Sequence, residues 1–138
     1  MINTTMNQPC PGTNTNGSTR PPGMLEIDKG QGHTAANGHL IPAALMGSGI
    51  DLRNLVAEYE KFNNPYLSGG VEKQIREGVK SGNRMLVSIV PRYENVNSGI
   101  PTIVEYNYGT LGGVMKHCVL RQSPTGGTTT GSATCPGR

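Results

Sequence analysis

The feature that most constrains the fold is one set of apolar residues with the spacing of a helix face, in a chain otherwise interrupted by glycine and proline. Val71, Ile75 and Val79 recur every four residues, which places them on one face of a helix. Gly82 lies just beyond the stripe, where helices commonly end. With 20 glycines, 10 prolines, no tryptophan and one phenylalanine in 138 residues, much of the chain must form loops. We therefore predict one main helix in a single domain with a modest core.

Short apolar runs on both sides of this helix predict strands. The four clearest runs are residues 54–59, 86–90, 102–106 and 114–120. Turn-forming residues separate the last three, which is typical of an antiparallel meander. We also expect a short strand at residues 25–27 and a loop at residues 30–38. The predicted class is α+β, with the main helix packed on a small antiparallel sheet.

The two ends of the chain differ in composition from its middle. Residues 1–19 are rich in Asn, Thr, Gly and Pro without periodicity, so we expect a flexible polar arm. Residues 122–138 are rich in Gly, Ser and Thr, and we expect a flexible tail. The ordered domain is then predicted to cover residues 20–121.

Three cysteines, Cys10, Cys118 and Cys135, leave two interpretations open. Their odd number means that at least one has no partner within the chain. Their spacing fits no zinc site, which needs paired ligands close together in sequence. The remaining alternatives are free thiols and a disulfide that ties two of these segments together.

Charge and hydropathy exclude few partners. A net charge of +3 is compatible with a polyanionic partner but does not require one. No apolar run approaches the roughly 20 residues of a membrane-spanning helix, so we expect no membrane partner. The polar N-terminus lacks the apolar segment of a Sec signal peptide, so export would depend on another system or on a larger parent chain.

His39 is the candidate general base, because histidine exchanges protons near neutral pH. Gly38 directly before it would let a bulky substrate approach the backbone. A neutral imidazole at this position could take a proton from an attacking water molecule. The alternative is a structural histidine at the edge of a strand.

Asn63 is the candidate metal ligand. It stands with Asn64 directly before Pro65, and the structural alternative is a helix start, which both residue types favour. In the functional interpretation its amide oxygen binds Mg²⁺, an ion that keeps most of its water molecules and often takes only one or two protein ligands. A neutral amide would leave the full charge of the ion to act on a phosphate.

Three charged residues are candidates for substrate contact. Glu72 and Arg76 lie four residues apart on the predicted helix, where they form an ordinary surface pair or a functional one. In the functional interpretation Glu72 orients metal-bound water, and Arg76 binds the scissile phosphate through its guanidinium group. Arg20, in a proline-rich turn, is either a second phosphate ligand or a simple surface charge.

Together these residues resemble the DNA/RNA non-specific endonucleases, which have the ββα-metal or His-Me finger fold. The resemblance is closest to the nuclease toxin domains at the C-termini of bacterial polymorphic and Rhs-type toxins, and it covers about residues 20–109. It is carried by Gly38-His39-Leu40-Ile41, Gly47-Ser48-Gly49, Asp51, Arg53-Asn54-Leu55-Val56, Asn63, Glu72 and Arg76.

The resemblance implies a metal-dependent endonuclease that cleaves DNA or RNA with little sequence preference and contacts it through backbone phosphates. It makes His39 the general base and Asn63 the ligand of one mostly water-ligated Mg²⁺, with Mn²⁺ as a substitute. The remaining site residues are helix-borne supports, a phosphate ligand and site-shaping positions: Glu72, Arg76, Arg20, Asn54, Arg53 and Gly38.

The resemblance also implies a toxin or effector that is secreted or delivered without a Sec signal and acts in the cytoplasm of a target cell. A cognate immunity protein is then expected. One departure matters, because many members have Asp-Arg-Gly-His where this chain has Ala36-Asn37-Gly38-His39. This departure leaves open a non-catalytic nucleic-acid-binding module on a decayed nuclease scaffold, and the Gly/Thr-rich tail with the two Cys-Pro-Gly triplets leaves open a secreted interaction domain.

Overall fold

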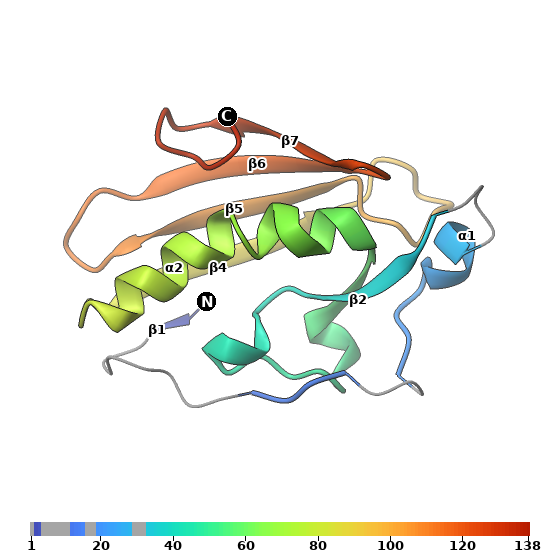
Figure 1. Cartoon of the computed structure of the whole chain (residues 1–138), viewed down its shortest axis with the longest axis horizontal. Helices are drawn as coiled ribbons and strands as arrows, with labels where there is room; N and C mark the ends of the chain where they lie inside the picture. The colour runs from blue at the N-terminus through green and yellow to red at the C-terminus, as the bar shows by residue number, and fades with distance from the viewer. Residues whose placement is uncertain (1, 4–11, 16–18, 29–32) are drawn as a thin grey trace.

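The structure, a computed structural model, describes residues 2–3, 12–15, 19–28 and 33–138. In this part of the chain a five-stranded antiparallel sheet, a two-stranded hairpin and one main helix form the fold (Figure 1). The large sheet has the strand order β1-β4-β5-β6-β7, and β2 pairs with β3 in the hairpin. The predicted α+β class with one main helix is confirmed.

The elements have the following bounds. The large sheet contains β1 (Ile2–Asn3), β4 (Met85–Arg92), β5 (Ile103–Thr110), β6 (Lys116–Ser123) and β7 (Gly126–Gly131). The hairpin contains β2 (Ala35–His39) and β3 (Leu55–Tyr59). The helices are α1 (Met24–Asp28) and α2 (Val71–Lys80), with the short helical segments η1 (Ala43–Leu45), η2 (Leu52–Asn54) and η3 (Phe62–Leu67).

Helix α2 covers one face of the large sheet, and Figure 1 shows it lying across β4 and β5. Its predicted stripe of Val71, Ile75 and Val79 is buried in the main core. On β5, Tyr106 and Tyr108 are also buried, in alternation with half-buried neighbours, as expected for a strand with one covered face. The meander β4-β5-β6, which was predicted from three apolar runs separated by turn-forming residues, is confirmed.

Two local predictions before the hairpin are wrong. Residues 25–27 belong to helix α1, because Met24 and Ile27, three residues apart, are buried together against Ala57 of β3. The loop predicted at residues 30–38 includes most of β2, whose Ala35–His39 pairs along its whole length with β3. Residues 29–32 lie outside the described part of the chain.

The C-terminal segment is not the flexible tail that we expected. Strand β7 pairs with β6 over six residues, and Cys135 forms a disulfide with Cys118 of β6. Gln122 is buried and connects the sheet to the hairpin, since its side chain accepts a hydrogen bond from Tyr59 N (2.9 Å) and donates to Ala57 O (3.3 Å). Glycine and threonine therefore continue the sheet here, and the ordered domain extends past residue 121.

The N-terminal segment is described only in part. Ile2–Asn3 pairs with β4, and Gly12 and Thr13 form hydrogen bonds with the loop after β2. The flexible arm predicted for residues 1–19 falls largely outside the described residues, as does Cys10. Among the described helices, none has the length and apolar character needed to cross a membrane.

Candidate active site

The hairpin and the segment after it have the order strand, strand, helix that the sequence predicted. His39 is the last residue of β2 and pairs with Leu55, the first residue of β3. Asn63 follows in η3, and Glu72 lies in the first turn of α2. The candidate base and the candidate metal ligand thus lie on two elements that both contact β3, and no hydrogen bond joins His39 to Asn63 in this structure.

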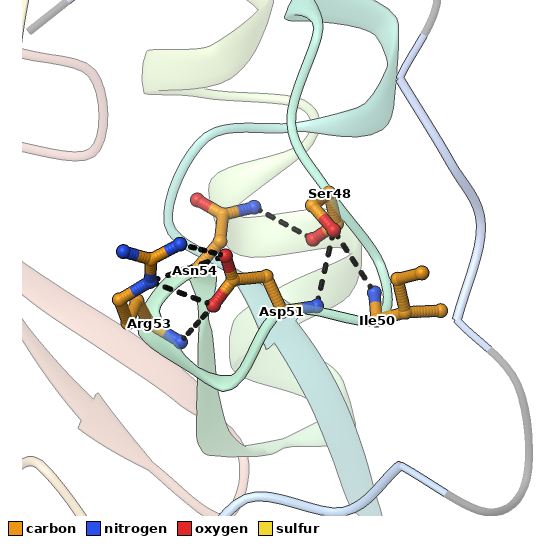
Figure 2. A network of polar contacts seen from close by, with 5 residues as sticks. All are labelled: Ser48, Ile50, Asp51, Arg53 and Asn54. Atoms are coloured by element: carbon orange, nitrogen blue, oxygen red, sulfur yellow. Dashed lines mark hydrogen bonds and ion pairs between the residues drawn. The ribbon is translucent and has the colours of Figure 1, made fainter.

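Asn54 holds the loop between the two strands of the hairpin. Its side-chain oxygen accepts a hydrogen bond from Ile41 N (2.9 Å), and its side-chain nitrogen donates to Ile41 O (3.0 Å) and Ser48 O (2.9 Å). Figure 2 shows this amide beside Ser48, whose hydroxyl accepts from the backbone nitrogens of Ile50 and Asp51. Asn54 therefore shapes the site indirectly, by fixing the loop that follows His39.

The His39 ring is held by a backbone carbonyl. Its Nε2 lies 3.1 Å from the carbonyl oxygen of Thr13. A carbonyl oxygen can only accept a hydrogen bond, so in the neutral ring the proton must be on Nε2. This leaves Nδ1 with the lone pair that a general base needs.

Glu58 is a site residue that the sequence analysis missed. It is almost completely buried on β3, and neither of its carboxyl oxygens has a hydrogen-bond partner among the described residues. A Cβ atom on Gly38 would lie only 2.2 Å from Cδ of Glu58. The space at Gly38 is thus filled by this carboxyl group, and not by substrate as we predicted. The available signal was a charged residue at the end of the apolar run Leu55-Val56-Ala57.

Burial changes the protonation of this region. Loss of hydration raises the pKa of Glu58 well above its ordinary value, and the nearby charge of Glu72 raises it further. Burial also raises the pKa of Glu72 to about 7, against the opposing charge of Arg76. The hydroxyl of Tyr106 is buried without a hydrogen-bond partner in the described structure, and its pKa is raised by burial and by both glutamates. Glu58, Glu72 and Tyr106 therefore form a buried polar cluster between the hairpin, α2 and β5.

Arg76 connects this cluster to η3. Its guanidinium group donates to Ser68 O (2.9 Å) and lies 3.9 Å from a carboxyl oxygen of Glu72. Ser68 in turn donates through its hydroxyl to Asn64 Oδ1 (2.7 Å) and through its nitrogen to Asn63 O (3.3 Å). The side-chain amide of Asn63 is half-buried and makes no hydrogen bond within the described residues. Ser68 therefore links the Arg76 side chain to the main-chain carbonyl of Asn63, and Glu72 lies beside Arg76.

Comparison with known proteins identifies the family. Residues 1–110 match the family model of the DNA/RNA non-specific endonucleases. The chain belongs to this family. Two solved structures of NucA from Streptococcus agalactiae, one with no metal bound and one with a magnesium ion bound, have similar folds.

The metal-free NucA structure is 17% identical, with a TM-score of 0.63 over 88% of this chain and 67% of NucA. The magnesium-bound structure is 18% identical, with a TM-score of 0.64 over 87% of this chain and 65% of NucA. A search of curated proteins finds no match. At this level of identity the two NucA structures support the endonuclease fold of the chain.

The departure from the usual endonuclease motif lies directly opposite Glu58. Ala36, where many members of the family have an acidic residue, is the cross-strand partner of Glu58. Side chains of such a pair point to the same face of the hairpin, so Glu58 supplies a carboxyl group on the face where Ala36 lacks one. Asn37, in the position of the usual arginine, donates to Thr19 O (3.1 Å).

Two predicted site residues of this endonuclease lie apart from the cluster. Arg20 forms an exposed ion pair with Asp28 (2.5 Å) and lines a groove of about 560 Å³ with α1 and Leu52. Arg53 has 91% of its side chain exposed and pairs with Asp51 (2.6 Å), which helps to lower the pKa of Asp51 to about 2. Neither guanidinium group contacts Glu58, Glu72 or Arg76.

The donor atoms of the cluster fit a hydrated hard cation. Among the described residues, no three His, Cys, Asp or Glu side chains are grouped so that they alone could hold a metal ion. The endonuclease has the side-chain amide oxygen of Asn63 on η3 and, on β3, the unpaired carboxyl oxygens of Glu58, whose pKa is raised further by nearby Glu72. Oxygen donors of this kind suit an ion such as Mg²⁺, whose own water molecules can donate to carboxylates.

Proposed function

We propose that this endonuclease family member hydrolyses phosphodiester bonds with His39 as its general base and a divalent cation as its cofactor. The observation that carries the proposal is the contact between the His39 ring and the Thr13 carbonyl. Because this contact keeps a proton on Nε2, the basic nitrogen Nδ1 remains available to accept a proton from water.

The chain's own residues supply the remaining steps. The water molecule that loses its proton to Nδ1 attacks phosphorus, in line with the leaving oxygen. The imidazolium formed at His39 keeps its Nε2–H donated to Thr13 O. We assign to Arg76 the stabilisation of negative charge on the phosphate, because its guanidinium is always charged and is placed where α2 meets η3. Arg20, which lies apart from this cluster and pairs with Asp28, is assigned a contact with another phosphate of the substrate.

Asn63 is the residue that we propose binds the cation directly, while Glu58 and Glu72 accept hydrogen bonds from its water molecules. When bound, such a cation neutralises charge that develops on the phosphate. The oxygen-only donors and the magnesium bound to the similar NucA structure support Mg²⁺ as this ion. We expect Mn²⁺ to substitute for it.

The proposed substrate is DNA or RNA, contacted mainly through backbone phosphates. Phosphate contacts carry no base sequence, so cleavage is expected to be largely sequence-independent and to weaken with rising salt. The net charge of +3 favours such a polyanion. Parallel assays with duplex DNA and with RNA establish which nucleic acid is preferred.

We also propose that the endonuclease acts as a toxin or effector in the cytoplasm of a target cell. The Cys118–Cys135 disulfide supports passage through an oxidising compartment, where such bonds form and persist. A producing cell would then need an immunity protein, for which an acidic surface would complement the positive charge of the toxin. Cytoplasmic expression of the active protein should arrest bacterial growth, and His39→Ala should relieve the arrest.

A plasmid assay tests the proposed function. Wild-type protein with Mg²⁺ should degrade the plasmid, whereas excess EDTA or the His39→Ala variant should leave it intact. His117→Ala is the matched control, because this exposed histidine lies on β6 and pairs with Glu105. Undiminished cleavage in EDTA would contradict the metal role, and undiminished cleavage by His39→Ala would contradict the general base.

The departure at Ala36-Asn37 favours one second candidate, a nucleic-acid-binding module that has lost catalysis. This module would retard DNA in a gel without cleaving it, whichever metal is added. A secreted interaction domain, the third possibility, would show no salt-dependent binding of DNA. The same protein preparations distinguish all three.

A further inference from the structure

We propose that one end of the molecule, formed by the turn between β5 and β6 and by the C-terminal end of α2, binds the surface of an anionic lipid membrane. The turn consists of residues 111–115, and Lys80, Arg84 and Lys116 are its basic neighbours. Figure 1 shows the turn and the end of α2 at the same end of the molecule, which we call the basic end. This inference goes beyond the proposed function and does not depend on it, because none of these residues belongs to the candidate active site.

The turn between β5 and β6 carries three large apolar side chains that are exposed to solvent. Val114 is 89% exposed, and Leu111 and Met115 are each 44% exposed. Gly112 has a φ of 82°, and a Cβ atom there would meet no other atom within 4 Å, so the turn projects from the body of the protein. Apolar residues gathered on one projecting turn indicate contact with another molecule, whereas single scattered ones are ordinary.

Hydrogen bonds and a ring contact fix the turn relative to its basic neighbours. The nitrogen of Leu111 donates to Arg84 O (2.7 Å), which joins the turn to the residue just before β4. Nζ of Lys116 donates to Oε1 of Gln74 on α2 (3.3 Å) and lies 5.7 Å from the centre of the Tyr108 ring. The apolar and the basic groups therefore form one surface.

The cations of the basic end have no acidic partners. Four exposed arginines elsewhere in the described part of the chain pair with carboxyl groups: Arg20, Arg53, Arg92 and Arg121. In contrast, Lys80, Arg84 and Lys116 form no ion pair with any described residue. Glu77, three residues before Lys80, is paired with Lys73 (3.9 Å). Positive charge without a counter-charge thus lies beside the apolar turn.

This combination fits a lipid surface better than a nucleic acid. Anionic headgroups attract Lys and Arg, and the hydrocarbon beneath them accepts aliphatic side chains. A nucleic acid would also attract the cations, but bases stack on aromatic side chains, and residues 111–115 include none. Binding of this kind lies on the membrane and needs no spanning helix. The hydropathy that led us to expect no membrane partner tests only for spanning helices.

The experiment uses the full chain and vesicles, in EDTA, of phosphatidylcholine alone or mixed in equal parts with phosphatidylglycerol. Val114→Ser removes an apolar contact, and Lys80→Gln combined with Arg84→Gln removes two charges. The matched controls are Val96→Ser, at a valine that is 91% exposed between β4 and β5, and Lys61→Gln, at an exposed lysine beside η3. Sedimentation with the vesicles measures affinity, and thermal melting confirms that each variant is folded.

Wild type should bind the mixed vesicles, bind pure phosphatidylcholine far more weakly, and dissociate as the salt concentration rises. Val114→Ser should weaken binding about 10-fold. The double variant should weaken it by about five-fold for each charge removed. Neither control should weaken it appreciably, and plasmid cleavage by Val114→Ser and by the double variant should equal that of wild type.

A tryptophan probe tests whether the turn enters the membrane. The chain contains no tryptophan, so Val114→Trp and the control Val96→Trp each report on one position. With mixed vesicles the emission of Val114→Trp should shift to shorter wavelength and be quenched by brominated lipid. The emission of Val96→Trp should not change.

Three results would overturn the proposal: no binding to the mixed vesicles, losses in the controls equal to those in the variants, or an unchanged emission of Val114→Trp. If the double variant loses affinity for plasmid DNA but keeps its affinity for vesicles, the basic end contacts nucleic acid and the proposal is wrong. The vesicle measurements require no cleavage, so they decide this proposal even if the proposed function fails.

Discussion

The carboxyl group of Glu58 occupies the place where any other residue at position 38 would put its side chain. Gly38 precedes the candidate base, and a Cβ atom there would lie 2.2 Å from Cδ of Glu58 and 2.4 Å from one of its oxygens. The Glu58 side chain from β3 therefore fills the space beside Gly38 of β2. The interaction free energy between substitutions at these two positions can be measured.

Gly38→Ala should lower the free energy of unfolding by about 1–3 kcal/mol, because the added methyl group overpacks a buried site. In Glu58→Ala the carboxyl group is gone, so adding Gly38→Ala to that variant should be much less harmful. Urea denaturation of the four proteins in this double-mutant cycle gives the coupling energy directly. Additive effects of the two substitutions would contradict the proximity of the two groups.

Asn54→Ala should destabilise the protein by roughly 2–3 kcal/mol, because three hydrogen bonds to the loop after β2 are lost. It should also lower kcat, since the loop supports Thr13. The adjacent Arg53→Ala is the matched control. Its exposed pair with Asp51 should contribute little to stability. Chemical denaturation and plasmid cleavage measure both effects, and equal losses in the two variants would contradict the assigned role of Asn54.

Stability should fall as pH rises from about 4.5 to about 7. Burial raises the pKa of Glu72 from 4.5 to about 7, so in this window the folded protein keeps a proton that the unfolded chain releases. The stabilisation is present below pH 4.5 and is lost as the pH passes 7, and Glu58 shifts in the same direction. The full change is on the order of 3 kcal/mol for Glu72.

Urea denaturation from pH 4.5 to 8 in EDTA tests this slope, and Glu72→Gln should make it less steep, leaving the contribution of Glu58. Asp51 and Glu94 have a pKa lowered to about 2, so they change stability in the opposite direction. The stabilisation that they contribute is lost as the pH falls below about 4.5, which lies outside this window. If the stability of Glu72→Gln falls with pH as steeply as that of wild type, a group other than Glu72 causes the pH dependence.

Loss of the Cys118–Cys135 disulfide should lower the free energy of unfolding by about 3 kcal/mol, as expected for a loop closed over 17 residues. Cys135→Ser and reduction with dithiothreitol should have similar effects, measured in a Cys10→Ser background that removes the third thiol. Thiol titration of the denatured, unreduced protein in that background should detect no free thiol. Two reactive thiols would show that the bond does not form.

The sequence was most informative where structure is local. Helix α2 follows from the spacing of Val71, Ile75 and Val79, which share one face of a helix, and β3 follows from one continuous apolar run, because both faces of this strand are buried. Helix α1 was missed because five residues with Met24 and Ile27 as buried positions contain little periodicity. Strand β7 was missed because its glycines and threonines have weak apolar alternation, and β6 and the disulfide supply what its composition lacks.

The candidate site divides in the same way. His39, Asn63, Glu72 and Arg76 were recognised from residue types in a familiar order, and their roles stay predictions. The groups that orient these side chains could not be predicted. Every residue has a main-chain carbonyl, and the carbonyl of Thr13 contacts His39 only because the chain folds so that the two meet. Glu58 was detectable as a charged residue in an apolar strand, but its contact with Gly38 depends on the register of the hairpin.

The support for the His39 ring comes from the main chain, and this determines which substitutions evolution can tolerate. Every amino acid carries the same carbonyl, so residue 13 can vary among homologues with the loss of only the hydroxyl contact to Gly49 N. Selection should act instead on the absence of side chains at positions 12 and 49, where a methyl group would collide with the opposite backbone. Searches for this device in distant sequences should therefore look for paired small residues, far apart in the chain, and not for a shared threonine.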